Sequence, residues 1–338
     1  MSNLKEILEK KKICKSVWFM RQAGRYLPEF RKIRSQNQNF MGLCLNSELS
    51  SEITLQPIKR FDLDSAIIFS DILMVPYALN QEIEFVKDQG PVLEDFNFKK
   101  FLNNDNISFT QKLNPVYKAI RKTREKLDKK KSLIGFVGAP WTLLIYMLGI
   151  KKDKKEVGYR KIKIEDFEIN LIFEKLNEYL CSHIENQINA GADVIQIFDS
   201  WAGLISPEDL SDYCYTPNLK IVNFCKKKEI PVICFPKGLN TNLKEFNNIV
   251  KPDAISLDYD IDPAWVKQNL TNVVLQGGLD PKLLLSSEKD ILAGAKKYLD
   301  MFKGLPYVFN LGHGLLPETD PDKVGKLIRF YREYENEK

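Results

Sequence analysis

The sequence has no apolar run long enough to cross a membrane and no apolar leader at its start. A membrane-spanning helix needs about 18 to 20 consecutive apolar residues, and no run in this chain approaches that length. The opening residues, MSNLKEILEKKK, lack the apolar stretch of a secretory signal, and Glu6 and Glu9 argue against a mitochondrial transit peptide. We therefore expect a cytoplasmic protein with no membrane association.

The excess of positive charge is also small. The chain has 50 Lys plus Arg against 45 Asp plus Glu, a net charge of +5, whereas a nucleic-acid-binding protein concentrates basic residues far more strongly. Its six cysteines include no C-x-x-C pair, as expected of reduced thiols rather than of a disulfide framework. With only two histidines as well, the sequence predicts no metal site. An anionic small molecule stays open as a partner.

Several familiar signatures are missing too. We find no G-x-G-x-x-G, no Walker A loop, no G-x-S-x-G and no linker-like or low-complexity segment in the 338 residues. These absences argue against a dinucleotide-binding sheet, a P-loop and a serine nucleophile on a tight turn. The economical prediction is a single domain spanning 1–338, with 1–15 as a peripheral N-terminal segment.

Eight short apolar runs stop at polar or glycine clusters and have the length of strands. They begin at Val17 (VWFM), Ser65 (SAIIFS), Leu133 (LIGFVG), Asp193 (DVIQIF), Pro231 (PVICF), Ala254 (AISLD), Asn272 (NVVLQG) and Tyr307 (YVFNLG). Most are apolar throughout, which is typical of strands that are covered on both faces.

Segments with helical periodicity separate most of these runs. From about Ile164 to Ala190 the apolar residues repeat on one helical face. Helix-start signals occur at Ser206 with Pro207, at Ser287 with Asp290 three residues later, and at Asp320 with Pro321. Alternation of strand and helix predicts parallel strands in a (β/α)8 TIM barrel or an open doubly wound sheet, and eight repeats favour the barrel.

The active site of a TIM barrel lies at the carboxyl ends of its strands. The residues that follow the predicted strands include Arg21 and Arg25, Asp71, Tyr146, Ser200 and His313. Arginines bind carboxylates in bidentate fashion, and an acid at the rim of an apolar interior can stabilise a developing cation. Structural alternatives are a solvated basic loop for the arginines, a helix cap or ion pair for Asp71, and plain turns at Ser200 and His313. His183, inside the long predicted helix, is interpreted as structural.

Motifs at these positions resemble the uroporphyrinogen decarboxylase family. They are MRQAGRYLPEFR from Met20, FSDIL from Phe69, GAPWTLLIYM from Gly138, FDSWAG from Phe198, GGLDP from Gly277 and FNLGHGLLPET from Phe309. The resemblance extends from about Val17 to the last predicted helix.

The resemblance implies a (β/α)8 barrel, usually a homodimer, that decarboxylates the four acetate arms of uroporphyrinogen III to give coproporphyrinogen III in haem and chlorophyll biosynthesis. It implies no cofactor and no metal. The implied catalytic residues are Asp71 and Arg21. The implied substrate-binding residues are Arg21, Gln22, Ala23, Gly24, Arg25, Asp71, Tyr146, Ser200 and His313, with Arg34 ranked lower.

Three positions depart from the family pattern. Ser16 stands where a proline commonly precedes Val17, Gly278 replaces a usual asparagine, and the loop GIKKDKKE after Leu148 is rich in lysine. Two other hypotheses stay open: a corrinoid-dependent methyltransferase with a zinc site, for which Cys234 lacks an H-x-C partner, and a tetrapyrrole carrier without catalysis.

Overall fold

The central feature of the fold is a curled parallel sheet. The computed structural model describes residues 3–86, 90–150 and 166–336, and within them seven strands pair in parallel and in chain order around the sheet. The strands are β1 (Ser65–Ile67), β4 (Ser132–Gly138), β5 (Val194–Asp199), β6 (Val232–Pro236), β7 (Ala254–Leu257), β8 (Val274–Gly277) and β9 (Tyr307–Val308). Seven of the eight predicted strands are therefore confirmed.

The segment around Val17, predicted as a strand, forms only an isolated parallel bridge to Phe309. It still occupies a strand's place between β9 and β1. The Phe309 N–H donates to the Ser16 carbonyl, and the Asp64 N–H donates to the Val17 carbonyl, each at 2.9 Å. A longer ladder does not form because the Val17 N–H donates to the Asp64 carboxylate at 2.7 Å and the chain turns after Phe19. The architecture is thus that of a TIM barrel, with one irregular position.

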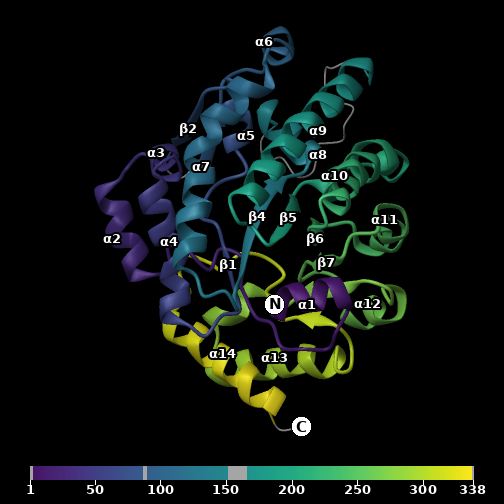
Figure 1. Ribbon diagram of the computed structural model, residues 1–338. Helices are drawn as coiled ribbons and strands as arrows, with labels where there is room; N and C mark the ends of the chain where they lie inside the picture. Colours follow the sequence, from purple (N-terminus) through teal and green to yellow (C-terminus); the bar gives the residue numbers. More distant parts are fainter. Residues whose placement is uncertain (1–2, 87–89, 151–165, 337–338) are drawn as a thin grey trace.

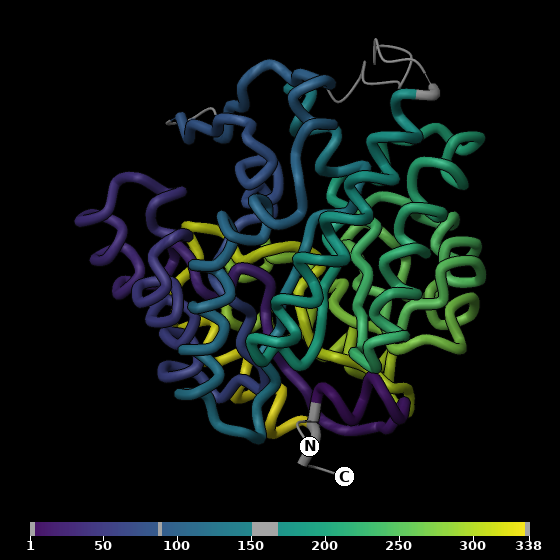
Figure 2. Tube along the Cα trace, turned by 45° about the horizontal axis from the view of Figure 1, so that its top comes forward, coloured from purple at the N-terminus to yellow at the C-terminus, as the bar shows by residue number. Residues whose placement is uncertain are grey.

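Helices surround the outside of this sheet (Figures 1 and 2). The outer helices are α4 (Ser47–Arg60), α7 (Asn106–Lys126), α9 (Asp166–Asn189), α10 (Thr216–Lys227), α11 (Leu243–Val250), α12 (Pro263–Asn269), α13 (Glu288–Met301) and α14 (Pro321–Asn336). The other helices are α1 (Asn3–Lys10), α2 (Pro28–Gln36), α3 (Phe40–Cys44), α5 (Met74–Ala78), α6 (Phe98–Leu102) and α8 (Pro140–Met147). Strands β2 (Ile83–Val86) and β3 (Gly90–Leu93) form a separate antiparallel pair.

Two of the three predicted helix starts are confirmed. The Ser287 side chain accepts a hydrogen bond from the Asp290 N–H at the start of α13, and α14 starts at Pro321. The third prediction is wrong in type, because Pro207–Asp209 is only a 3-10 turn, η3. The Ser206 hydroxyl donates to the Asp209 carboxylate instead of capping a helix. A π-helical turn, η4 (Ser211–Tyr215), follows before α10 starts.

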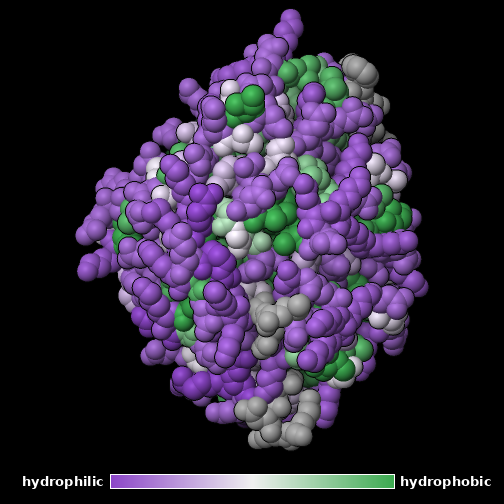
Figure 3. Space-filling model, in the orientation of Figure 1, coloured by the Kyte–Doolittle hydropathy of each residue, from purple (hydrophilic) through white to green (hydrophobic). Residues whose placement is uncertain are grey.

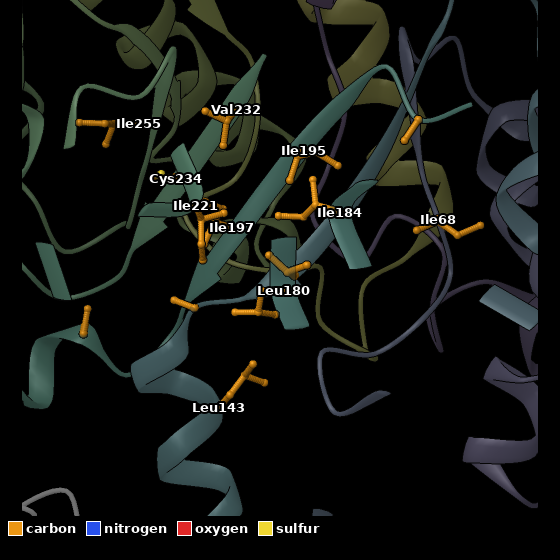
Figure 4. Packing of buried hydrophobic residues seen from close by; sticks show 14 of the residues in the cluster. Ile68, Leu143, Leu180, Ile184, Ile195, Ile197, Ile221, Val232, Cys234 and Ile255 are labelled. Atoms are coloured by element: carbon orange, nitrogen blue, oxygen red, sulfur yellow. The ribbon is translucent and has the colours of Figure 1, made fainter. Parts of the chain in front are cut away.

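The strands are apolar throughout because both of their faces are buried. Ile195 and Ile197 of β5 point outward and pack with Leu180 and Ile184 of α9 (Figure 4). Val194, on the opposite face of the same strand, belongs to the cluster that fills the barrel interior. The predicted helical face of α9 is buried as expected: Ile169, Ile172, Phe173, Leu176, Leu180 and Ile184.

Helix α1 lies in the N-terminal segment that the sequence predicts to be peripheral. Its side chains Leu4, Ile7 and Leu8 are at most 1% exposed and pack with the apolar residues of the barrel interior, such as Ile134 and Val308. The helix therefore lies across the amino-terminal end of the barrel (Figure 2). The barrel interior is apolar at that end, and an amphipathic helix shields it from water.

The face of the molecule shown in Figure 3 is mostly hydrophilic. Lys129, Lys130 and the run from Lys226 to Lys228 are exposed, as is typical of solvated helix ends. No helix within the described ranges has the length and apolar character needed to span a membrane.

The departure from the family pattern at Ser16 has a local explanation. Its backbone N–H donates to the Tyr331 hydroxyl at 3.0 Å, inside the protein. A proline at this position would lack that donor. The serine is therefore suited to the contact between the start of the barrel and α14.

His183 is buried, and its Nδ1 lies 3.0 Å from the Tyr117 hydroxyl. Burial lowers the pKa of His183 from its ordinary 6.5 to about 3. Below pH 6.5 the unfolded chain binds a proton at this site and the folded chain does not, so the free energy of unfolding falls as the pH falls. Between pH 7.5 and pH 5.5 this effect lowers the free energy of unfolding by about 1.4 kcal/mol.

We expect His183→Gln to remove that dependence. Urea unfolding at pH 7.5 and 5.5 measures it: the parent chain should lose about 1.4 kcal/mol more than the variant over this interval. An identical pH dependence in the two proteins would contradict a buried neutral histidine.

Candidate active site

A cavity of about 1080 Å³ opens at the carboxyl ends of the strands. Its lining includes the turn after Met20, the loops that follow β1, β5 and β9, Tyr146 of α8 after β4, and residues of α2, α3, β2 and β3. Eight of the nine predicted site residues line this one cavity: Arg21, Ala23, Gly24, Arg25, Asp71, Tyr146, Ser200 and His313. Positions spread over almost 300 residues are thus brought together by the curled sheet.

Gln22 is the predicted site residue that does not line the cavity. It is fully buried; its side-chain oxygen accepts from the Phe19 N–H at 3.0 Å and its amide nitrogen donates to the Ser65 carbonyl at 2.9 Å. These bonds attach the turn to β1. Gln22 therefore holds the neighbouring arginines in place and has no surface of its own in the cavity.

Arg21 has a strained backbone with φ of +59°, a conformation that non-glycine residues rarely adopt and that clusters at functional sites. Its side chain lies against Gly314, where an added Cβ would come within 2.3 Å of the Arg21 Cδ. Only glycine leaves room for the arginine there. The turn after Met20 and the loop after β9 thus fix the guanidinium jointly.

Asp71 follows β1 and is half-buried. One carboxylate oxygen accepts from the Leu73 N–H at 2.9 Å, so it forms a local turn, as the capping alternative anticipated. Burial raises the pKa of Asp71 above its ordinary value, while the Leu73 N–H and the positive charge of Arg21 oppose that rise. Asp71 and Arg21 therefore face the same space and act on each other electrostatically.

Tyr146 lines the cavity and is supported by Trp201. Tyr146 is carried by α8, and its ring meets the Trp201 ring edge-on, with centroids 6.0 Å apart. Burial raises the pKa of the Tyr146 phenol, and the negative charge of Asp71 raises it further. The Trp201 indole N–H and the positive charge of Arg21 lower this pKa. Ser200 directly precedes Trp201, and His313 lies half-buried between two glycines after β9.

The charged residues that line the described part of the cavity are three arginines, Arg21, Arg25 and Arg34, and one carboxylate, Asp71. Arg31 instead donates to the Arg25 and Tyr26 carbonyls at 3.0 and 2.9 Å and supports the turn from outside. An excess of guanidinium groups around one acid suits a ligand with several carboxylates.

Sequence reasoning missed an aromatic surface in the same cavity. Phe136, Phe198 and Phe235 come from β4, β5 and β6 and meet edge to face, with centroids 5.6 Å and 6.4 Å apart. We call these three residues the phenylalanine floor. Its members lay inside the predicted strands, and the two-residue alternation could have assigned them to the inner face if the register had been known.

No group of three or more His, Cys, Asp or Glu side chains among the described residues could hold a metal ion. The lysine-rich loop GIKKDKKE lies from Lys151 onward outside the described residues. The predicted departure at this loop is therefore not tested.

Comparison with known proteins agrees with this geometry. A model of the family "Uroporphyrinogen decarboxylase (URO-D)" matches residues 4–334. The chain is 41% identical over 331 residues to the uroporphyrinogen decarboxylase of Rickettsia felis, covering 94% of this chain and 93% of that one. It is 38% identical over 327 residues to the Jannaschia sp. enzyme of the same name, covering 94% of each.

Among solved structures, a methyltransferase from Methanosarcina mazei superposes with a TM-score of 0.75 over 98% of both chains. Its sequence identity of 18% supports the shared barrel fold alone. The family model and the two relatives, in contrast, extend over nearly the whole length of the sequence. The chain therefore belongs to the uroporphyrinogen decarboxylase family, the carboxy-lyases of porphyrin biosynthesis.

Proposed function

We propose that this cavity binds uroporphyrinogen III and that Asp71 and Arg21 act in the decarboxylation of its four acetate arms to give coproporphyrinogen III. One observation carries the assignment of these two residues. Asp71 is the carboxylate that lines the described part of a cavity of about 1080 Å³, and the charge of Arg21 acts on it there.

The reaction needs a place for the electron pair that carbon dioxide leaves behind. In our proposal, protonation of the pyrrole carbon beside the acetate makes the ring a cation. The C–C bond to the carboxylate then breaks, its electron pair forms an exocyclic double bond, and carbon dioxide leaves. A proton added to the methylene carbon and one lost from the ring give the methyl product. The substrate is its own electron sink, so no cofactor is required.

Asp71 stabilises the cationic ring. An ionised carboxylate at the cavity wall accepts hydrogen bonds from the pyrrole N–H groups, and its negative charge is worth more there than in water. Burial raises the pKa of Asp71, so keeping its carboxylate ionised in the free site costs free energy. A cationic ring bound beside the carboxylate lowers that cost. This interaction is stronger in the transition state than in the ground state.

The other residues bind the arms of the macrocycle. Arg21 grips the acetate that reacts, because a guanidinium binds a carboxylate in bidentate fashion. Arg25, Tyr146, Ser200 and His313 hold the remaining acetates and propionates and so determine which ring faces Asp71. The phenylalanine floor offers an apolar surface to the macrocycle itself.

Anaerobic incubation with uroporphyrinogen III, followed by counting the carboxyl groups of the product, tests the function. We expect loss of one carboxyl per acetate arm. Tight binding without loss of carboxyl groups would favour the carrier hypothesis, and stoichiometric zinc in the purified protein would favour the methyltransferase.

Asp71→Asn should lower kcat by an amount equivalent to about 2 to 4 kcal/mol, because it removes the charge that stabilises the ring cation. The amide oxygen can still accept from the Leu73 N–H, so the local turn survives. Thermal unfolding at pH 7.5 should show no loss of stability, since a carboxyl whose folded pKa is raised destabilises the fold once ionised. Near-normal turnover would remove Asp71 from the mechanism.

Arg25→Ala should raise KM about tenfold with little change in kcat, because the exposed guanidinium contacts a non-reacting arm. Arg121→Ala, which removes an exposed arginine on the outer face of α7, is the matched control and should leave both constants unchanged. If the two variants have the same KM, Arg25 has no role in holding the substrate.

We also propose that the chain forms a homodimer and acts in the cytoplasm, as the family resemblance implies. None of the six cysteines, all of which the structure describes, forms a disulfide, as is usual for proteins of reducing compartments. Sedimentation analysis should give twice the chain mass of 39.1 kDa. A species of the single-chain mass at micromolar concentration would contradict the dimer.

A further inference from the structure

A hydrogen-bond network connects α8 to the end of β5 just outside the cavity. The Thr142 hydroxyl donates to one oxygen of the Asp199 carboxylate at 2.6 Å. The same hydroxyl accepts from the Trp201 N–H at 3.1 Å. One buried side chain of α8 thus bonds the residues on both sides of Ser200.

A second side chain of α8 completes the connection. The Trp141 indole N–H donates to the Trp201 carbonyl at 3.0 Å. Both polar groups of the Trp201 backbone are therefore bonded to successive residues of α8. Tyr146 lies four residues after Thr142, on the same face of that helix, and its ring contacts the Trp201 ring.

Asp199 itself is held from the other side. It is 1% exposed, and its second oxygen accepts from the Asn218 amide at 3.2 Å and from the Cys214 thiol at 3.6 Å. Cys214 belongs to the π-helical turn η4, and Asn218 follows in α10. A π-helical turn inside a helical segment is uncommon and is frequent at functional sites.

The donors that these contacts supply to Asp199 are neutral. Burial raises the pKa of Asp199 to about 6, against the opposing effect of the Thr142, Asn218 and Cys214 bonds. A charged partner would lower the free-energy cost of burying an ionised carboxylate more than these neutral donors do. Keeping an acid in this position is costly for the fold, and a role in fixing nearby cavity residues accounts for that cost.

We propose that Thr142 and Asp199 are positioning residues, which fix Tyr146 on α8 relative to Ser200 on the loop after β5 and thereby orient the arms of the substrate. This inference rests on the proposed function of the cavity. Neither residue lines the cavity, so both act through Tyr146 and Ser200. Loss of the Thr142 hydroxyl leaves the Asp199 oxygen and the Trp201 N–H without their bonds, and the two elements are free to separate.

The test uses variants of the whole chain. Thr142→Val and Thr142→Ala both remove the hydroxyl but leave side chains of different size, so a packing defect in one variant can be told from loss of the hydroxyl. Thr142→Ser keeps the hydroxyl. We expect the valine and alanine variants to raise KM, and the anaerobic dissociation constant of uroporphyrinogen III, about tenfold with kcat changed less than about threefold. The serine variant should stay within about twofold of the parent chain.

A double-mutant cycle separates positioning from general destabilisation. In a Tyr146→Phe background the effect of Thr142→Val should shrink to about threefold or less, because the two changes act on one unit. Thr123→Val is the matched control: Thr123 is a buried threonine of α7 whose hydroxyl bonds only to outer helices, at Ala119 and Ser51. It should lose stability without a change in KM.

Three results would overturn the proposal. The first is an unchanged KM in folded Thr142→Val or Thr142→Ala. The second is a change in KM on Thr142→Val that is equally large in the Tyr146→Phe background and in the parent chain. The third is a rise in KM for Thr123→Val that matches the rise for Thr142→Val. Failure of the proposed function is distinct, since it would appear in the parent chain as unchanged carboxyl content. The ratios of dissociation constants would still decide the role of Thr142 in that case.

Discussion

The placement of Asp71 and Arg21 on the wall of one cavity is the constraint on which the account of this protein depends. A half-buried carboxylate is unfavourable in its ionised form, as the raised pKa of Asp71 shows. A positive charge at the cavity wall reduces that cost, and a cationic ring bound between the two would reduce it further. In the proposed mechanism the same arrangement favours both an anionic substrate and a reaction that passes through a cation.

The barrel makes this placement possible because it brings the ends of distant chain segments together around one opening. Helix α1 covers the opposite end, where Leu4, Ile7 and Leu8 complete the apolar interior. At the open end, rigidity comes from specific contacts: Gln22 attaches the arginine turn to β1, and Gly314 leaves space for the Arg21 side chain. The strained backbone of Arg21 is tolerated because these neighbours determine its position.

Much of this arrangement was predictable from the sequence, and the exceptions have physical reasons. Short apolar runs located seven strands, since burial on both faces removes polar residues from them. The run at Val17 is equally apolar, yet the Val17 N–H donates to the Asp64 side chain. Asp64 lies 47 positions further along the chain, and hydrophobic periodicity carries no information about such a contact. Position after a strand identified the cavity lining at Asp71, Tyr146, Ser200 and His313. Position after a strand could not distinguish Gln22, which faces inward, from its neighbours. It also could not identify Phe136 or Thr142, because their roles depend on register and on tertiary contacts.

The most direct measurement is an experimental structure of the chain with coproporphyrinogen III bound under anaerobic conditions. The account predicts the macrocycle against the phenylalanine floor, with pyrrole nitrogens within about 3.2 Å of the Asp71 carboxylate and a carboxylate arm at Arg21. A macrocycle bound in this cavity with Asp71 turned away from the pyrrole nitrogens would contradict it.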